Sequence, residues 1–207
     1  MLSDDVVREI DLLAHRAGTN RSNFINQVLA EYVNLTTPEK RANDIFKAIE
    51  EMTRPMGELI PFFAPNNLTM SLKSCLQYKY RPTLKYEVAL MNGYGSSIGE
   101  LSVVFRTRSE ELISDMEQFF GIWKTAEDGF LSAAGLPPRE YALYNNKLVR
   151  SIASPQKNCT SEELAEAIGG YIELFDSAIK EYLSGQCSAE DIAAAYKNFA
   201  EHSKILI

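Results

Sequence analysis

The stretch LSDDVVREIDLLAHRAGTNRSNFINQVLAEYV, residues 2–33, decides how the chain begins to fold. Its first half repeats apolar residues at helical spacing, with Ser3 placed to cap the helix and Gly18 placed to end it. Its second half opens at Thr19 or Asn20, either of which can cap a helix, and repeats apolar residues in the same way. The stretch therefore predicts two helices joined by a tight glycine turn.

The apolar stripes of these two helices are too wide for the pair to bury against each other alone. The residues that need a cover are Val7, Ile10, Leu13, Phe24, Ile25, Val28, Leu29 and Tyr32. A second copy of the same unit is the simplest cover, because two-fold homodimers are the commonest soluble oligomers. We therefore expect these residues to form the core of a homodimer.

The same stretch resembles the helical part of ribbon-helix-helix DNA-binding proteins. The resemblance lies in the run SDDVVxEIDxLAxRxG followed by TNRSNFIxxVLxEYV, in the Arg21-Ser22 pair that opens the second helix, and in the closing Leu29 and Tyr32. It covers about thirty of the 207 residues. It implies a dimeric head that binds double-stranded DNA. A backbone phosphate would then lie at the start of the second helix, where free amides and the helix dipole suit an anion. The residues expected there are Asn20, Arg21, Ser22 and Asn23.

One element of that family is not found in this sequence. Ribbon-helix-helix proteins place a strand before the first helix, and two such strands pair into a ribbon that reads bases in the major groove. Only Met1 and Leu2 precede the first predicted helix, whereas an average strand has about five or six residues. Either the true start of the protein lies upstream of residue 1, or the chain has been shortened there, or the base-reading element has been lost.

Charge is placed unevenly along a chain whose net charge is −7. Residues 1–35 hold three Lys/Arg against five Asp/Glu, a poor balance for a DNA-binding module, whose affinity comes largely from phosphate neutralisation. Residues 68–108 hold six Lys/Arg against two Asp/Glu, and residues 109–207 hold eight against sixteen. We therefore do not expect the acidic C-terminal half as a whole to form a nucleic-acid surface.

Composition also bounds the setting of the protein. No apolar run reaches membrane-spanning length and no basic-then-apolar leader opens the sequence, so we expect a cytoplasmic protein with no membrane partner. The three cysteines, Cys75, Cys159 and Cys187, show no CxxC spacing. We expect them to be small buried residues rather than disulfide partners or zinc ligands.

Beyond the head, the pattern predicts a connector helix and then an α+β domain. Thr37 and Pro38 open a helix that should run to about Thr53. Between residues 68 and 107 the apolar period changes from 3.6 to 2, which predicts a three-stranded antiparallel meander with one apolar face. Four helices should cover that face. Three of them should begin near Ser109, at Thr160 and at Ser188, and the fourth should lie around Arg139 to Ile152. The predicted limits are 1–35 for the head, 36–55 for the connector helix and 56–207 for the α+β domain.

Catalytic chemistry finds little support. The two histidines lie in amphipathic helical stretches, and the sequence has no phosphate-binding loop, dinucleotide fingerprint or nucleophile elbow. We therefore expect no catalytic residue, no cofactor and no metal site.

The predicted meander combines lysines with tyrosines. Lys73, Lys79 and Lys85 alternate with Tyr78, Tyr80 and Tyr86. Sheet platforms of this composition can bind single-stranded nucleic acid. The tyrosines share the apolar set with leucines, however, so half-buried tyrosines over a core with lysines on the wet face is the better interpretation.

The sequence thus favours a DNA-binding regulator, either a dimeric transcriptional repressor or a plasmid-type accessory protein. Its C-terminal domain would sense a small-molecule ligand or bind a protein ligand. The alternative is an interaction protein that does not bind DNA and uses the N-terminal two-helix unit only to dimerise.

Overall fold

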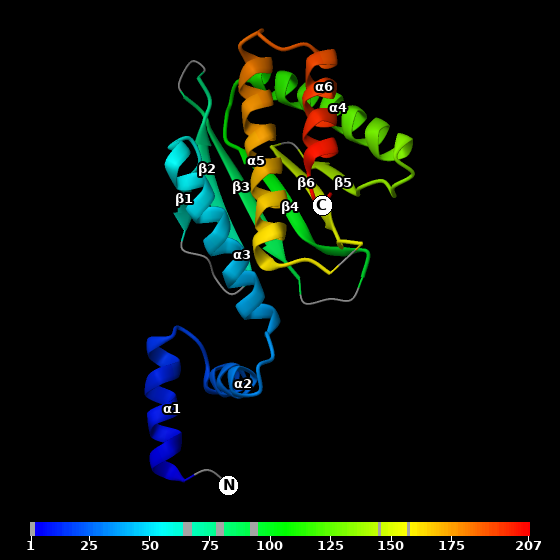
Figure 1. Cartoon of the computed structure of the whole chain (residues 1–207). Coiled ribbons are helices and arrows are strands. Elements are labelled where there is room, and N and C mark those ends of the chain that lie inside the picture. The colour runs from blue at the N-terminus through cyan, green and yellow to red at the C-terminus, as the bar shows by residue number, and fades with distance from the viewer. Residues whose placement is uncertain (1–2, 64–67, 78–80, 92–94, 145, 157) are drawn as a thin grey trace. The chain divides into compact units, whose positions relative to one another are not determined.

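The computed structural model describes residues 3–63, 68–77, 81–91, 95–144, 146–156 and 158–207 (Figure 1). The chain divides into two compact units, Met1–Arg41 and Ala42–Ile207. The described residues form six α-helices and a six-stranded antiparallel sheet, so the fold class is α+β.

The first unit contains helices α1 (Asp4–Arg16) and α2 (Arg21–Tyr32). Gly18 lies just beyond α1 with a left-handed φ of 66°, a conformation that costs glycine little, and the Thr19 amide donates to the Ala14 carbonyl at 2.9 Å. Ser3 occupies the N-cap position of α1, but its side chain makes no capping hydrogen bond. Asn20 is the residue that caps α2.

Helix α3 (Pro38–Thr53) begins and ends where the sequence predicts. The Thr37 hydroxyl accepts a hydrogen bond from the Lys40 amide at 3.2 Å at its start. From Ala42 onward the helix belongs to the second unit, and its inner residues Ile45, Phe46 and Ile49 join the hydrophobic core there. A short 3-10 turn, Arg54–Met56, follows α3.

The sheet of the second unit has twice as many strands as predicted. The strands are β1 (Ile60–Phe63), β2 (Thr69–Cys75), β3 (Thr83–Leu90), β4 (Ser97–Phe105), β5 (Tyr141–Tyr144) and β6 (Lys147–Ala153). Their order in the sheet is β1-β2-β3-β4-β6-β5, and every pairing is antiparallel. The prediction of a three-stranded meander therefore missed β1, β5 and β6.

The prediction of a helix around Arg139 to Ile152 is wrong, because this segment forms the β5–β6 hairpin. The inward positions of β6 are Leu148, Arg150 and Ile152. A charged residue at the middle position breaks the apolar alternation that would have marked a strand. Arg150 can lie there only because a carboxylate meets it inside the fold.

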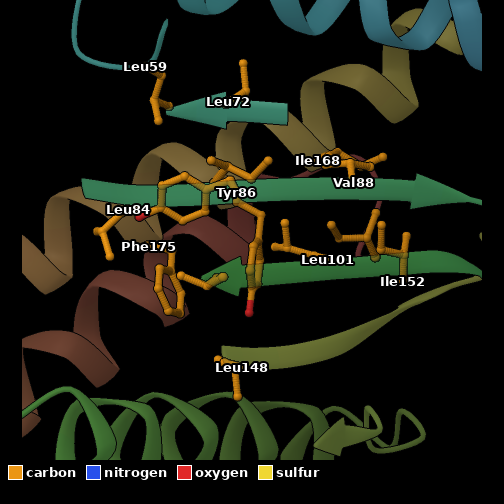
Figure 2. Packing of buried hydrophobic residues seen from close by; sticks show 14 of the residues in the cluster. Leu59, Leu72, Leu84, Tyr86, Val88, Leu101, Leu148, Ile152, Ile168 and Phe175 are labelled. Carbon is orange, nitrogen blue, oxygen red and sulfur yellow. The ribbon is translucent and has the colours of Figure 1, made fainter. Parts of the chain in front are cut away.

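One face of the sheet carries the core. The strand registers place Leu72, Tyr86, Val103 and Leu148 in one line across four strands. Helices α3, α4 (Glu110–Ala133), α5 (Ser161–Leu183) and α6 (Ala189–His202) all contribute buried residues to the cluster that this face begins. Figure 2 shows Tyr86 and its neighbours on the strands, with Ile168 and Phe175 of α5 among them.

The helices of this cover begin as their capping residues predict. The side chains of Ser109, Thr160 and Ser188 accept the capping hydrogen bonds of α4, α5 and α6. Trp123 of α4 is fully buried, at 0 % exposure. Tyr86 lies on the core face, which confirms the core interpretation for that tyrosine.

One expectation is contradicted by the structure, and another concerns residues that it does not describe. The expected burial of the cysteines is wrong, because Cys75 is exposed and Cys159 and Cys187 are only partly buried. Residues 78–80, which were expected to belong to the first strand of the meander, lie outside the described residues.

Candidate functional site

The start of α2, where a phosphate anchor was predicted, is held by its own cap. The Asn23 amide donates to the Asn20 side chain at 2.9 Å, and the Phe24 amide donates to the Asn20 carbonyl at 3.0 Å. Among the four residues of the predicted phosphate anchor, Arg21 and Ser22 are therefore the two whose backbone amides have no helix carbonyl one turn earlier to donate to. Asn20 and Asn23 shape this end of the helix, which leaves Arg21 and Ser22 as the groups that can meet an anion.

Arg21 contacts an acidic side chain of α1. Its Nε lies 2.6 Å from Asp11 Oδ1 and its Nη2 lies 2.5 Å from Asp11 Oδ2, so the guanidinium makes a bidentate ion pair with the carboxylate. The hydrogen bond from Arg21 lowers the pKa of Asp11, and the same bond raises the pKa of Arg21. Both side chains are about half exposed, so an incoming phosphate can compete with Asp11 for Arg21.

The residues predicted as a dimer core are uncovered within their own unit. Val7, Ile10, Phe24 and Ile25 are only partly buried. Leu13, Val28, Leu29 and Tyr32 are exposed; the exposed fraction of Leu29 is 58 % and that of Tyr32 is 86 %. Ala14 is the one apolar residue that the described part of this unit buries. The two-helix pair thus carries an apolar surface that it does not cover itself.

The second unit contains a buried ion pair that the sequence analysis missed. Glu127 of α4 is 0 % exposed and Arg150 of β6 is 2 % exposed. Arg150 donates through Nη2 to Glu127 Oε1 and through Nε to Glu127 Oε2, the latter at 3.1 Å. It also donates to the main-chain oxygen of Ile207, which holds the end of the described chain against the sheet.

Three tyrosines complete the surroundings of Glu127. Tyr196 donates to Oε1 at 2.8 Å, Tyr171 donates to Oε2 at 3.1 Å, and Tyr141 also donates to Oε2. The Tyr171 hydroxyl in turn accepts a hydrogen bond from Trp123 Nε1 at 2.7 Å. The carboxylate therefore accepts five hydrogen bonds and is saturated, which suits a structural hub and not a general base.

Burial sets the protonation of these tyrosines. It raises the pKa of Tyr171 well above the ordinary value, and it raises the pKa of Tyr196 as well. Both hydroxyls therefore stay protonated near neutral pH and can keep donating to Glu127. The sequence held one signal of this cluster, because Glu127 is a charged residue among the apolar residues of its helix. Nothing in the sequence indicated that Arg150 would be its partner.

A second buried carboxylate joins α5 to the sheet. Asp176 accepts hydrogen bonds from Ser74 at 3.0 Å and from Tyr86 at 2.8 Å, and it lies 2.6 Å from Lys180 Nζ. Lys180 also lies 2.7 Å from Glu58. Burial raises the pKa of Tyr86 well above the ordinary value, with the charge on Asp176 adding to the effect. This cluster, like that of Glu127, is internally satisfied.

Two surface hollows accompany these clusters. A cavity of about 1220 Å³ lies beside Lys180, with Lys73, Arg81, Glu58 and Glu111 also on its wall. A groove of about 870 Å³ runs between α4 and α6, lined mainly by small residues such as Gly121, Gly129 and Ala193. The first is polar and mixed in charge, and the second has little to orient a ligand by hydrogen bonds.

Within the part of the chain that the structure describes, no group of three or more His, Cys, Asp or Glu side chains could hold a metal ion. In the same described ranges, no helix has both the length and the apolar character needed to cross a membrane. Comparisons with protein-family models, with curated proteins and with solved structures found no match for this chain.

Proposed function

We propose that this protein is a dimeric DNA-binding regulator, a transcriptional repressor or a plasmid-type accessory protein, that dimerises through residues 1–35. The observation that carries the proposal is the uncovered apolar surface of α1 and α2, whose exposed members include Leu13, Val28, Leu29 and Tyr32. Full burial of one such side chain contributes about 1.5–3 kcal/mol. A second copy of the pair would therefore gain much by packing against the first.

The start of α2 supplies the DNA contact in this proposal. The amides of Arg21 and Ser22 lie at the positive end of the helix dipole, and the Ser22 hydroxyl is exposed beside them. Arg21 would exchange Asp11 for a backbone phosphate, an exchange between two anions of similar geometry. Such a contact fixes the position of the protein on DNA without reading sequence.

The second unit would carry the regulatory input. It has a core of its own and a polar cavity beside Lys180, where a small-molecule ligand or a protein segment could bind. Basic and acidic groups share the cavity wall, so a ligand with both polar and charged groups suits it best.

A specific observation favours a second candidate function. The head is acidic in balance, and its Arg21 is already paired with Asp11. Both features fit a protein that uses α1 and α2 only to dimerise and that binds another protein through its second unit.

Binding titrations on random duplex DNA at several salt concentrations separate the two candidates, using protein that includes any residues encoded upstream. Arg21→Ala should weaken binding to all duplexes about equally and reduce the salt slope by about one. Asp11→Asn should act in the opposite direction, because it frees Arg21 for the phosphate. Arg8→Ala is the matched control, since it removes an exposed arginine of the same head that pairs with Asp5.

Full affinity and an unchanged slope for Arg21→Ala would rule out this anchor. If the unsubstituted protein binds no duplex at low salt, the dimerisation-only function replaces the proposal.

A further inference from the structure

The face of the sheet opposite the core carries a row of lysines that only the strand pairing reveals. The registers align Lys73 of β2 with Lys85 of β3, Lys85 with Val104 of β4, and Val104 with Lys147 of β6. Directly paired residues of neighbouring strands point to the same side of a sheet. The three lysines therefore form one line across four strands, which we call the lysine row.

The row continues to both edges of the sheet. Ile60 of β1 pairs with Lys73, and Tyr144 of β5 pairs with Lys147. Ile60 and Tyr144 are both exposed, and none of the lysines belongs to the hydrophobic cluster on the other face. Every described helix of the second unit contributes to that cluster on the opposite face, and the three lysines of the row are partly exposed.

Charges of both signs lie next to the row. Arg81 and Arg106 are exposed and lie just beyond the strand ends that the row crosses. Glu87 pairs with Lys85 at 2.5 Å, and Glu58 and Glu111 share a cavity wall with Lys73 and Arg81. Lys73 and Lys85 are directly paired residues of β2 and β3, so an anion laid across the row would meet both ammonium groups together.

We propose that the lysine row binds the phosphate backbone of duplex DNA, in addition to the contact at the start of α2. The inference rests on the proposed function in one respect: a DNA-binding chain with an acidic head must neutralise phosphates elsewhere. The row spans three inter-strand intervals, about 14 Å. At one charge per 3.4 Å along each strand, about four phosphates fall within that length. The Tyr144 hydroxyl at the end of the row can donate to a further phosphate oxygen.

The test is a salt titration of full-chain protein on random duplex DNA. The row variant Lys73→Gln, Lys85→Gln, Lys147→Gln is compared with the control variant Lys124→Gln, Lys197→Gln, Lys204→Gln, which loses the same charge from exposed helical and C-terminal positions. If each row lysine neutralises one phosphate, the slope falls by about 2.7 per bound chain in the row variant. Between 50 and 200 mM salt its affinity should then change roughly 40-fold less than that of the unsubstituted protein. Arginine at the same three positions should restore the slope.

Equal slopes for the row and control variants, with the unsubstituted protein binding DNA, would overturn the lysine row and leave the proposed function intact. Absence of duplex binding by the unsubstituted protein would overturn both. Binding to phosphatidylserine vesicles that depends on the row, with DNA binding unchanged, would assign the face to a lipid surface and also overturn the proposal. A change of oligomeric state in the row variant alone would assign it to a second copy of the chain, with the same consequence.

Discussion

The two units of this protein treat their apolar residues in opposite ways. In the described residues, every buried apolar side chain except Ala14 belongs to Ala42–Ile207. Among the described residues of the short first unit, eight large apolar side chains are exposed: Val6, Leu12, Leu13, Val28, Leu29, Tyr32, Val33 and Leu35. Among those of the much longer second unit, four are exposed: Ile60, Met91, Leu143 and Tyr144. The second unit buries an apolar core of its own, whereas the first leaves most of its large apolar residues exposed.

The second unit also differs in burying charge. Glu127 and Arg150 lie inside it with all five hydrogen bonds to the carboxylate satisfied, while the ion pairs of the first unit are exposed. A buried pair of this kind stabilises little against an apolar replacement, but loss of one partner is severe. The contrast predicts where substitutions will destabilise the chain.

The largest effect is expected for Glu127→Ala. It leaves the Arg150 guanidinium buried without its carboxylate and should lower the free energy of unfolding of the second unit by about 3–5 kcal/mol. Urea unfolding followed by the fluorescence of Trp123 measures this directly, since Trp123 is the single tryptophan of the chain. Glu117→Ala, at an exposed position of the same helix, is the control and should change stability by about 0.5 kcal/mol or less. A loss below about 1 kcal/mol for Glu127→Ala would contradict the hub.

A smaller effect per residue is expected from the buried tyrosines at high pH. The pKa of Tyr86, Tyr171 and Tyr196 is raised in the folded protein by burial. Above the unfolded pKa near 10 the unfolded chain loses protons that the folded chain keeps, so stability falls as pH rises. Between pH 10 and 11 each tyrosine should cost about 1 kcal/mol. Its stabilising contribution is fully present below pH 10.

Unfolding midpoints measured from pH 8 to 11 test this, together with Tyr171→Phe. That variant should show a shallower fall above pH 10, by the share of one tyrosine, whatever its stability at pH 8. Stability that is level from pH 8 to 11 would show that these hydroxyls are not held protonated by the fold.

Features that depend on neighbouring residues were predictable from the sequence. The capping residues Asn20, Ser109, Thr160 and Ser188 mark helix starts, because a cap joins groups only three residues apart. The left-handed turn at Gly18 is equally local. The period of the apolar residues also placed β3 within the predicted meander.

Features that depend on residues far apart in the chain could not be predicted from the sequence. The β5–β6 hairpin carries Arg150 where an apolar residue would have shown the strand, and only the fold brings Glu127 to it. The lysine row depends on the pairing of β4 with β6, whose residues Val104 and Lys147 lie far apart in the chain. The Arg21–Asp11 pair joins two helices across a turn. The sequence therefore did not show that the Arg21 guanidinium, predicted to contact a phosphate, is already paired with a carboxylate.

We expect the first unit to be completed by a second copy of itself. Analytical ultracentrifugation of the full chain at micromolar concentrations tests it most directly, with Leu29→Asp as the disrupting variant and Leu143→Asp, an exposed leucine of the second unit, as its match. A charge in the shared core would remain unpaired there, at a cost of several kcal/mol. We expect a dimer for the unsubstituted chain and for Leu143→Asp, and a monomer with an intact second unit for Leu29→Asp. A folded monomer for the unsubstituted chain, or a dimer lost in Leu143→Asp and kept in Leu29→Asp, would contradict it.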